Sequence, residues 1–223
     1  MNLAGILDSL EKHYGKVKLA GPADPYEMIL YTNCGYPAND LSCPKGFDAL
    51  RRLVGVQPEQ ILAAPEPQLT QIMRLGGIVP ELRAKRLKEI AWRVTEKFGG
   101  NLAAVLKRPV PEARKALRQF PTIGEPGAEK ILLFTGAAPI AAVPSGQVHV
   151  LHRLGFGSEK KNYAAGYRSA QEAVATALPA ACVALQRAYL LIQRHGREIC
   201  KRGRPLCGAC PVSADCAFFR NGK

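Results

Sequence analysis

Four of the seven cysteines fall close together near the end of the 223-residue chain. They are Cys200, Cys207, Cys210 and Cys216, and their spacing is C-x6-C-x2-C-x5-C. Four thiolates on short loops can surround a zinc ion or a four-iron cluster, because both bind soft, deprotonated sulfur. Zinc ribbons usually carry two CxxC pairs and this segment has one, so the spacing favours a cluster and leaves zinc open. Four buried free cysteines are the third interpretation.

The remaining cysteines give no sign of a second site. Cys34, Cys43 and Cys182 are isolated, and packing in the core is the expected role for each. An odd number of cysteines without a secretory signal disfavours a disulfide framework. No stretch approaches the roughly 18 apolar residues of a membrane span. We therefore expect a cytoplasmic monomer, associated with the nucleoid if bacterial, that binds no membrane.

The chain is strongly basic, with 31 Lys and Arg against 18 Asp and Glu and a formal net charge of +13. This balance favours a polyanionic partner, and dispersal of the charge along the chain argues for nucleic acid rather than a membrane surface. One basic run, Lys201-Arg202-Gly203-Arg204, lies between the first two clustered cysteines. We interpret Lys201, Arg202 and Arg204 as phosphate contacts; a solvated surface loop is the alternative.

A second candidate site lies at residues 120–132, which read F-P-T-I-G-E-P-G-A-E-K-I-L. A tight turn before a helix leaves backbone N–H groups free to bind phosphate, and the helix dipole adds partial positive charge. Gly124 permits close backbone approach, and Pro126 suits the first helical position. The candidate DNA-binding residues of this turn are Thr122, Ile123, Gly124 and Gly127.

These sites must be positioned by helices, because helical spacing recurs along the chain and no segment alternates with period two. One apolar face is formed by Leu3, Ile6, Leu7, Leu10 and Tyr14. A longer helix begins at Pro80 and ends at Gly99. Further helices are predicted at residues 26–34, 46–54, 58–63, 67–75, 102–106, 111–119, 126–134, 147–154, 163–178 and 182–195. The sequence therefore predicts an all-α protein.

The cysteine spacing and the turn resemble the endonuclease III family of helix-hairpin-helix DNA glycosylases. The cysteines match the family's C-terminal iron–sulfur motif ligand for ligand, and residues 120–132 are similar to its hairpin, L-P-G-V-G-x-K-x-A-x-x-(V/I)-L. The resemblance covers roughly residues 26–216. It implies a six-helix barrel domain at 22–135 with the hairpin at 120–134, and a cluster domain of 1–21 and 136–223 with its metal loop at 200–216. It also implies a [4Fe-4S] cluster as cofactor and damaged double-stranded DNA as partner.

The chain differs from the family at the positions of the catalytic lysine and aspartate. Bifunctional members attack the sugar with a lysine two residues beyond the second hairpin glycine, and Pro126 stands there; Lys130, one turn on, is a weak substitute. The family places an aspartate near the start of the following helix, where this chain has Pro144, or Ser145 if the register slides by one. Proline has neither a nucleophile nor a carboxylate, so a lysine-dependent lyase is not expected and the catalytic residues are unknown. Thr122 also replaces the first hairpin glycine.

The last candidates are residues that would contact an extruded base. The family has a base-extruding segment after its second helix, and residues 31–40 correspond to it. Tyr31, Asn33 and Tyr36 could stack on or hydrogen-bond to a base, with core packing of the tyrosines an equal alternative. Ser145 could orient a water or cap a helix, and capping is favoured. His149 stands where the family has an arginine, and either polar packing or phosphate contact would suit it.

The leading interpretation is a DNA-binding base-excision-repair protein that probes duplex DNA for damaged or mispaired bases, and a monofunctional DNA glycosylase if it is an enzyme. One rival is a non-catalytic iron–sulfur lesion sensor. The other is a zinc-bearing structural or RNA-binding protein. Metal analysis separates the zinc protein from the other two, and separate scoring of base release and strand nicking separates the glycosylase from the sensor.

Overall fold

The structure is a computed structural model that describes residues 2–36 and 42–222. These residues form thirteen α-helices, three short 3-10 turns and no strand, which confirms the predicted all-α class. The chain divides into two compact units: unit 1 is Met1–Leu19 with Leu132–Lys223, and unit 2 is Ala20–Ile131. The predicted boundaries, after residues 21 and 135, lie a few residues later in the chain. No described helix is both long and apolar enough to cross a membrane.

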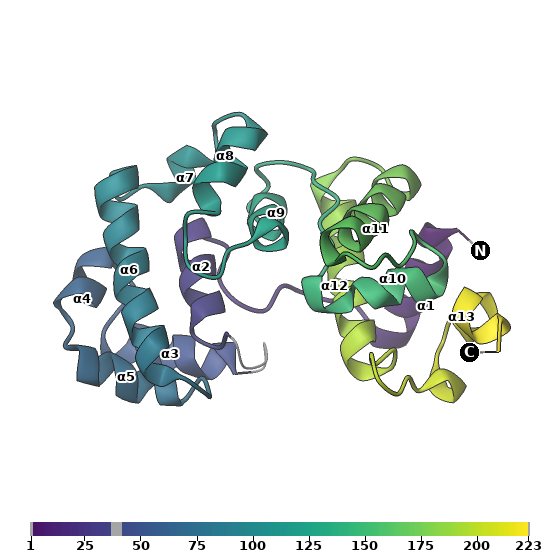
Figure 1. Cartoon of the computed structure of the whole chain (residues 1–223), viewed down its shortest axis with the longest axis horizontal. Coiled ribbons are helices and arrows are strands. Elements are labelled where there is room, and N and C mark those ends of the chain that lie inside the picture. The colour runs from purple at the N-terminus through teal and green to yellow at the C-terminus, as the bar shows by residue number, and fades with distance from the viewer. Residues whose placement is uncertain (1, 37–41, 223) are drawn as a thin grey trace. The chain divides into compact units, whose positions relative to one another are not determined.

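Unit 2 is built from helices that prolines punctuate (Figure 1). They are α2 (Pro25–Asn33), α3 (Cys43–Leu53), α4 (Pro58–Ala63), α5 (Glu66–Arg74), α6 (Pro80–Phe98), α7 (Leu102–Val105), α8 (Val110–Leu117) and α9 (Glu125–Phe134), whose last residues belong to unit 1. Proline stands in the first turn of α2 to α6 and of α8, where a missing N–H removes no intrahelical bond. Helix α6 packs against α4 and α5 through buried residues that include Leu87 and Ile90. The predicted helix at 46–54 begins earlier, at Cys43, because Pro44 fits its first turn.

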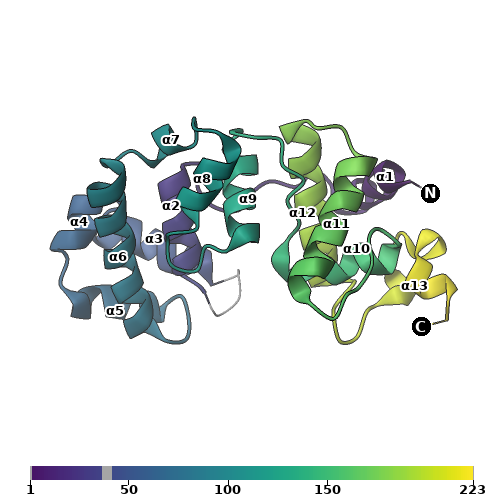
Figure 2. The same cartoon turned by 45° about the horizontal axis from the view of Figure 1, so that its top comes forward.

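In unit 1 the first helix of the chain packs against the last third. Its elements are α1 (Leu3–Tyr14), α10 (Val148–Leu154), α11 (Tyr163–Ala177), α12 (Cys182–Glu198) and α13 (Ala217–Arg220), with 3-10 turns at 145–147, 207–209 and 213–215. Helix α1 lies beside α11 and α12 (Figures 1 and 2) and buries the predicted Leu3, Ile6, Leu7 and Leu10 face. Each fully buried aliphatic side chain contributes about 1.5–3 kcal/mol, which an isolated helix of this length lacks. Tertiary packing in unit 1 therefore stabilises α1.

A fully buried arginine links helix ends in unit 2. Arg83 on α6 is 0% exposed and donates to the carbonyls of Cys34 (2.6 Å), Met73 (2.5 Å) and Gly77 (2.6 Å). These carbonyls lie just beyond or within the last turns of α2 and α5, where helices leave acceptors unpaired. A side chain at Gly76 would overlap the Cys34 carbonyl and the guanidinium, so only glycine fits there. Arg83 thus ties the end of α2 to the loop between α5 and α6.

Candidate metal centre and nucleic-acid interface

The four clustered cysteines line one pocket of unit 1. Cys200 and Cys216 are buried, and Cys207 and Cys210 are partly buried. The other residues that line the pocket are Arg153, Leu154, His195, Ile199, Pro205, Ser213, Phe218 and Phe219. The structure therefore brings the four predicted ligands together, in surroundings that are mostly apolar.

Two thiols of the pocket, those of Cys200 and Cys210, are reluctant to ionise. Burial raises the pKa of Cys200, although the guanidinium of Arg153 opposes this, and burial also raises the pKa of Cys210. Such thiols stay protonated unless a cation is bound, because the charged form is poorly solvated. Within residues 2–36 and 42–222, no three His, Cys, Asp or Glu side chains stand close enough to hold a single metal ion. The all-sulfur donor set is of the kind that zinc and iron–sulfur clusters accept.

Arg153 on α10 connects this pocket to the basic loop. Its guanidinium donates to the carbonyls of Lys201 (2.8 Å) and Arg202 (2.7 Å), and one of its nitrogens lies 3.6 Å from the Cys200 sulfur. The same group stacks on the Phe218 ring at 4.9 Å. The loop backbone is thereby fixed while its cationic side chains stay exposed, as phosphate contacts require. Arg153 is not among the predicted site residues, because nothing in the sequence signals its contact with a loop 48 residues later.

The predicted hairpin lies in unit 2, where α8 is followed by a turn and then α9. Ile123 is buried and anchors the turn, while Gly124 is exposed. A Cβ built on Gly124 would meet only the Pro126 Cδ, at 3.9 Å, and its φ is not positive. Neither packing nor backbone conformation therefore requires glycine at this position. The open space leaves room for an external group beside the first amides of α9, which have no intrahelical acceptor.

Thr122 adopts the backbone conformation that glycine prefers. Its φ is +66°, and its hydroxyl is buried without a hydrogen-bond partner in the described structure. A left-handed conformation costs an L-residue roughly 1–2 kcal/mol. Threonine at this position therefore adds strain to the turn. Asn33 supports the turn from α2, since its amide donates to the Pro121 carbonyl at 3.2 Å.

Two acids at the start of α9 share one arginine. Arg114 on α8 lies 3.1 Å from the carboxylate of Glu129 and 3.9 Å from that of Glu125. Glu129 is 1% exposed, so its pairing offsets the cost of a buried charge. The pairing also reduces the repulsion that these acids would exert on a phosphate. Pro126 lies in the first turn of the same helix, and Lys130 lies one turn further on.

The base-contact candidates of unit 2 lie in different surroundings. Tyr31 is partly buried and packs edge-on against Phe47, with ring centroids 5.5 Å apart. Asn33 is fully buried, so its side chain does not face solvent. Tyr36 is 50% exposed and lies 5.9 Å below the Arg86 guanidinium. Residues 37–41, which include the rest of the 31–40 segment, lie outside the described residues.

The candidates of unit 1 gather around the turn that precedes α10. Pro144 is buried and Ser145 is exposed at the start of the 145–147 turn. Helix α10 begins at Val148 without a side-chain cap, so the capping role expected for Ser145 is wrong. The Tyr163 hydroxyl instead donates to the Ser145 carbonyl at 2.9 Å, and its ring is 52% exposed. Arg202 lies near enough to oppose the rise that burial causes in the pKa of Tyr163. Tyr163 is an exposed aromatic that the sequence analysis missed.

His149 is partly buried and contacts the backbone of the cysteine segment. Its Nε2 lies 2.8 Å from the Cys200 carbonyl, and its Nδ1 is buried without a partner in the described structure. Burial is the largest of the effects that lower the pKa of His149, so the ring is neutral at pH 7. In this state it carries no charge with which to attract a phosphate.

Comparisons with known proteins identify the fold of the chain. No protein-family model matches the chain. A thymine-DNA glycosylase of Aeropyrum pernix is 28% identical over 105 residues, a match that spans 47% of this chain and only 43% of that relative. A trapped endonuclease III–DNA covalent intermediate has a TM-score of 0.76 at 20% identity and covers 99% of this chain and 96% of the other. A thermostable thymine-DNA glycosylase has a TM-score of 0.76 at 21% identity and covers 98% and 97%. At these identities the structural likeness establishes the fold.

Proposed function

We propose that this chain, which has the fold of endonuclease III and of thymine-DNA glycosylase, is a base-excision-repair protein that probes duplex DNA for damaged or mispaired bases. If it acts on a base, it is a monofunctional DNA glycosylase without lysine-dependent lyase activity. The observation that carries the proposal is the hairpin turn. Its exposed Gly124 is not required by the protein's own packing, and it lies beside unpaired helix amides in a chain of net charge +13.

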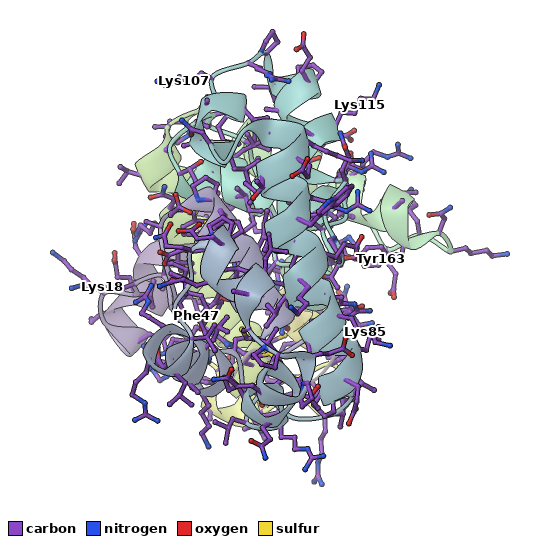
Figure 3. All side chains as sticks on the ribbon, turned by 90° about the vertical axis from the view of Figure 1, so that its left-hand side faces the viewer. Lys18, Phe47, Lys85, Lys107, Lys115 and Tyr163 are labelled. Atoms are coloured by element: carbon purple, nitrogen blue, oxygen red, sulfur yellow. The ribbon has the colours of Figure 1, made fainter. Side chains whose placement is uncertain are left out.

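The basic surface supports DNA as the partner. The basic loop holds Lys201, Arg202 and Arg204 exposed above an ordered backbone, and Figure 3 shows Lys85 and Lys115 pointing outward from unit 2. Neutralising a phosphate contact reduces the slope of log affinity against log salt by about one unit. Replacing the three loop cations with alanine should therefore flatten the slope by up to about three units. A matched variant that replaces the exposed Lys12, Lys16 and Lys18 should keep the wild-type slope, and equal slopes for the two variants would contradict the assignment.

The hairpin is tested by Gly124→Ala. A methyl group at this position meets no protein atom closer than 3.9 Å, so the variant should unfold at the wild-type urea concentration. It should bind duplex DNA about tenfold more weakly, equivalent to about 1.4 kcal/mol, because the methyl group occupies the space of a phosphate oxygen. Unchanged DNA affinity in a normally folded variant would remove the hairpin from the interface.

The chemistry follows from two prolines. A lyase that works through a lysine forms an imine with the opened sugar, and borohydride reduces the imine to a stable protein–DNA crosslink. With Pro126 and Pro144 at the lysine and aspartate positions of the resembling family, we expect no efficient crosslink on abasic duplex. Pro126→Lys alone should not restore lyase activity, because the carboxylate is missing too. Efficient trapping by the unmodified protein would contradict this, with Lys130 the first suspect.

The same prolines favour a second candidate, a lesion sensor that binds damaged DNA without cutting it. A panel of damaged and mispaired duplexes, with thymine mispairs included because of the Aeropyrum relative, separates the two candidates. Base release should be scored as strand cleavage after alkali treatment. Lyase activity should be scored as strand nicking without alkali. Release that becomes visible only after alkali supports the monofunctional glycosylase. Binding without release on any duplex supports the sensor. In either case we propose that the exposed Tyr36 of unit 2 contacts the extruded base.

We also propose that Cys200, Cys207, Cys210 and Cys216 hold a [4Fe-4S] cluster. A cluster takes one thiolate at each of four irons, whereas the ligands of one zinc ion all lie about 2.3 Å from it. Four cysteines line one pocket, one for each iron of such a cluster. The bound group would deprotonate the buried thiols and hold the 200–216 segment at four points. Anaerobically purified protein should contain about four iron and four sulfide per chain. Stoichiometric zinc without sulfide would favour the zinc-bearing rival.

A further inference from the structure

His195 is a buried polar residue beside the four cysteines, and the proposed function does not use it. It is 1% exposed on the last turn of α12 and lines the same pocket as the cysteines. Its Nε2 lies 3.7 Å from the Cys210 sulfur, and its Nδ1 lies 3.0 Å from the Tyr14 hydroxyl. Its backbone carbonyl accepts the amide of Cys200 at 2.8 Å. Both ring nitrogens and the backbone carbonyl of His195 therefore have a contact, and two of these contacts are with cysteines of the metal loop.

If a bound group makes Cys210 a thiolate, the contacts determine which ring nitrogen of His195 carries the proton. A thiolate has no proton to give, so a ring nitrogen that bonds to it must be the donor. With Nε2 as the donor, Nδ1 of a neutral ring is the acceptor, and the Tyr14 hydroxyl donates to it. Tyr14 is itself held in place: Arg194 donates to its carbonyl at 3.0 Å and stacks on its ring at 4.8 Å.

We propose that His195 is a hydrogen-bond donor to the Cys210 thiolate of the bound cluster, and that Tyr14 on the first helix fixes the ring in this role. The inference rests on the proposed cluster and adds a positioning residue to its site. A donor to a ligand sulfur stabilises the more negative, reduced form of a cluster and so raises its reduction potential. It also opposes protonation of the sulfur, which is a route to loss of iron. The first helix of the chain would then support the metal loop through His195.

The test uses full-length protein, purified without oxygen, and follows the loss of cluster absorbance in excess chelator. Outer hydrogen-bond partners typically change metal affinity by about 10–100-fold, so His195→Phe should lose iron at least about tenfold faster than the wild type. His195→Gln keeps an N–H donor and should lie between the two. Tyr14→Phe keeps the ring of His195 and should shift the rate in the same direction by less. The reduction potential should fall in the order wild type, His195→Gln, His195→Phe.

His152→Phe is the matched control. Its ring bonds only the Gly166 carbonyl, at 3.2 Å, among the contacts described, and it does not line the cysteine pocket. Iron loss and potential in this variant should match the wild type. Equal behaviour of the His195 and His152 variants would overturn the role of His195 and leave the cluster standing. Wild-type protein without iron and sulfide would overturn both proposals. If His195→Phe fails to fold, a wild-type rate and potential in Tyr14→Phe would overturn the Tyr14–His195 arrangement.

Discussion

Replacing Thr122 with glycine should stabilise unit 2. The left-handed backbone costs threonine roughly 1–2 kcal/mol, and a buried hydroxyl without a partner costs about 1–3 kcal/mol. Glycine removes both costs but loses about 0.5–1 kcal/mol in backbone entropy and forfeits the packing of one methyl group, about 0.8 kcal/mol. The expected net gain in the free energy of unfolding is therefore about 2 kcal/mol, the centre of a range from about 0.2 to about 3.7 kcal/mol.

This gain can be measured by urea unfolding that is monitored through tryptophan fluorescence, because the signal comes from unit 2. The chain has a single tryptophan, Trp92, which lies on α6 in unit 2. The midpoint for Thr122→Gly should rise without a change in slope, because the surface exposed on unfolding is the same. A midpoint equal to or below that of the wild type would refute the assignment of strain.

Thr122→Ala separates the two costs. Alanine removes the hydroxyl and keeps the left-handed strain, so its midpoint should lie between those of the wild type and Thr122→Gly. If alanine and glycine gave the same midpoint, the hydroxyl alone would account for the effect. The backbone of the turn would then be relaxed, contrary to our interpretation of its φ.

Three further predictions follow from contacts described above. Arg83→Met should lower the free energy of unfolding by about 3 kcal/mol, because three carbonyls lose the hydrogen bond from the guanidinium. Arg51→Met, which breaks an exposed ion pair, should lower it by less than about 1 kcal/mol. Similar urea midpoints for the two variants would contradict the role of Arg83. Asn33→Leu should speed the exchange of the amide hydrogens of residues 122–124, measured by mass spectrometry. Wild-type exchange would show that the turn does not depend on Asn33. Tyr163→Ala should weaken DNA binding about fivefold or more through lost stacking while Tyr163→Phe retains it, and equal losses would assign the effect to the hydroxyl.

Local patterns in the sequence predicted the helices well because each pattern acts within one element. The apolar spacing from Leu3 to Leu10 predicts a buried face, and the structure buries it completely. Prolines marked helix starts because their missing N–H is tolerated only there. The four cysteines line one pocket because the short segments between them keep Cys200 and Cys216 near one another.

Contacts between distant segments could not be predicted in the same way. On α6, Leu82 is 45% exposed while the adjacent Arg83 is fully buried, the reverse of what hydropathy suggests. The cause is three carbonyls that accept hydrogen bonds from its guanidinium, one of them 49 residues earlier in the chain. Asn33 is a similar case: its polar side chain suggests contact with a base, whereas it is fully buried and bonds to a carbonyl 88 residues later. A single sequence does not record which distant group supplies a polar residue's partner.

The pairing of α1 with the last third of the chain has a consequence for biosynthesis. A ribosome releases α1 first, yet its partners α11 and α12 follow more than 140 residues later. Unit 2, which is continuous in sequence, can fold during that interval, as domains generally do in order of synthesis. Until residues 163–198 emerge, the Leu3, Ile6, Leu7 and Leu10 face has no native surface to cover it. The nascent chain therefore carries an exposed apolar segment next to an already folded unit, and transiently exposed hydrophobic surface of this kind is what chaperones bind.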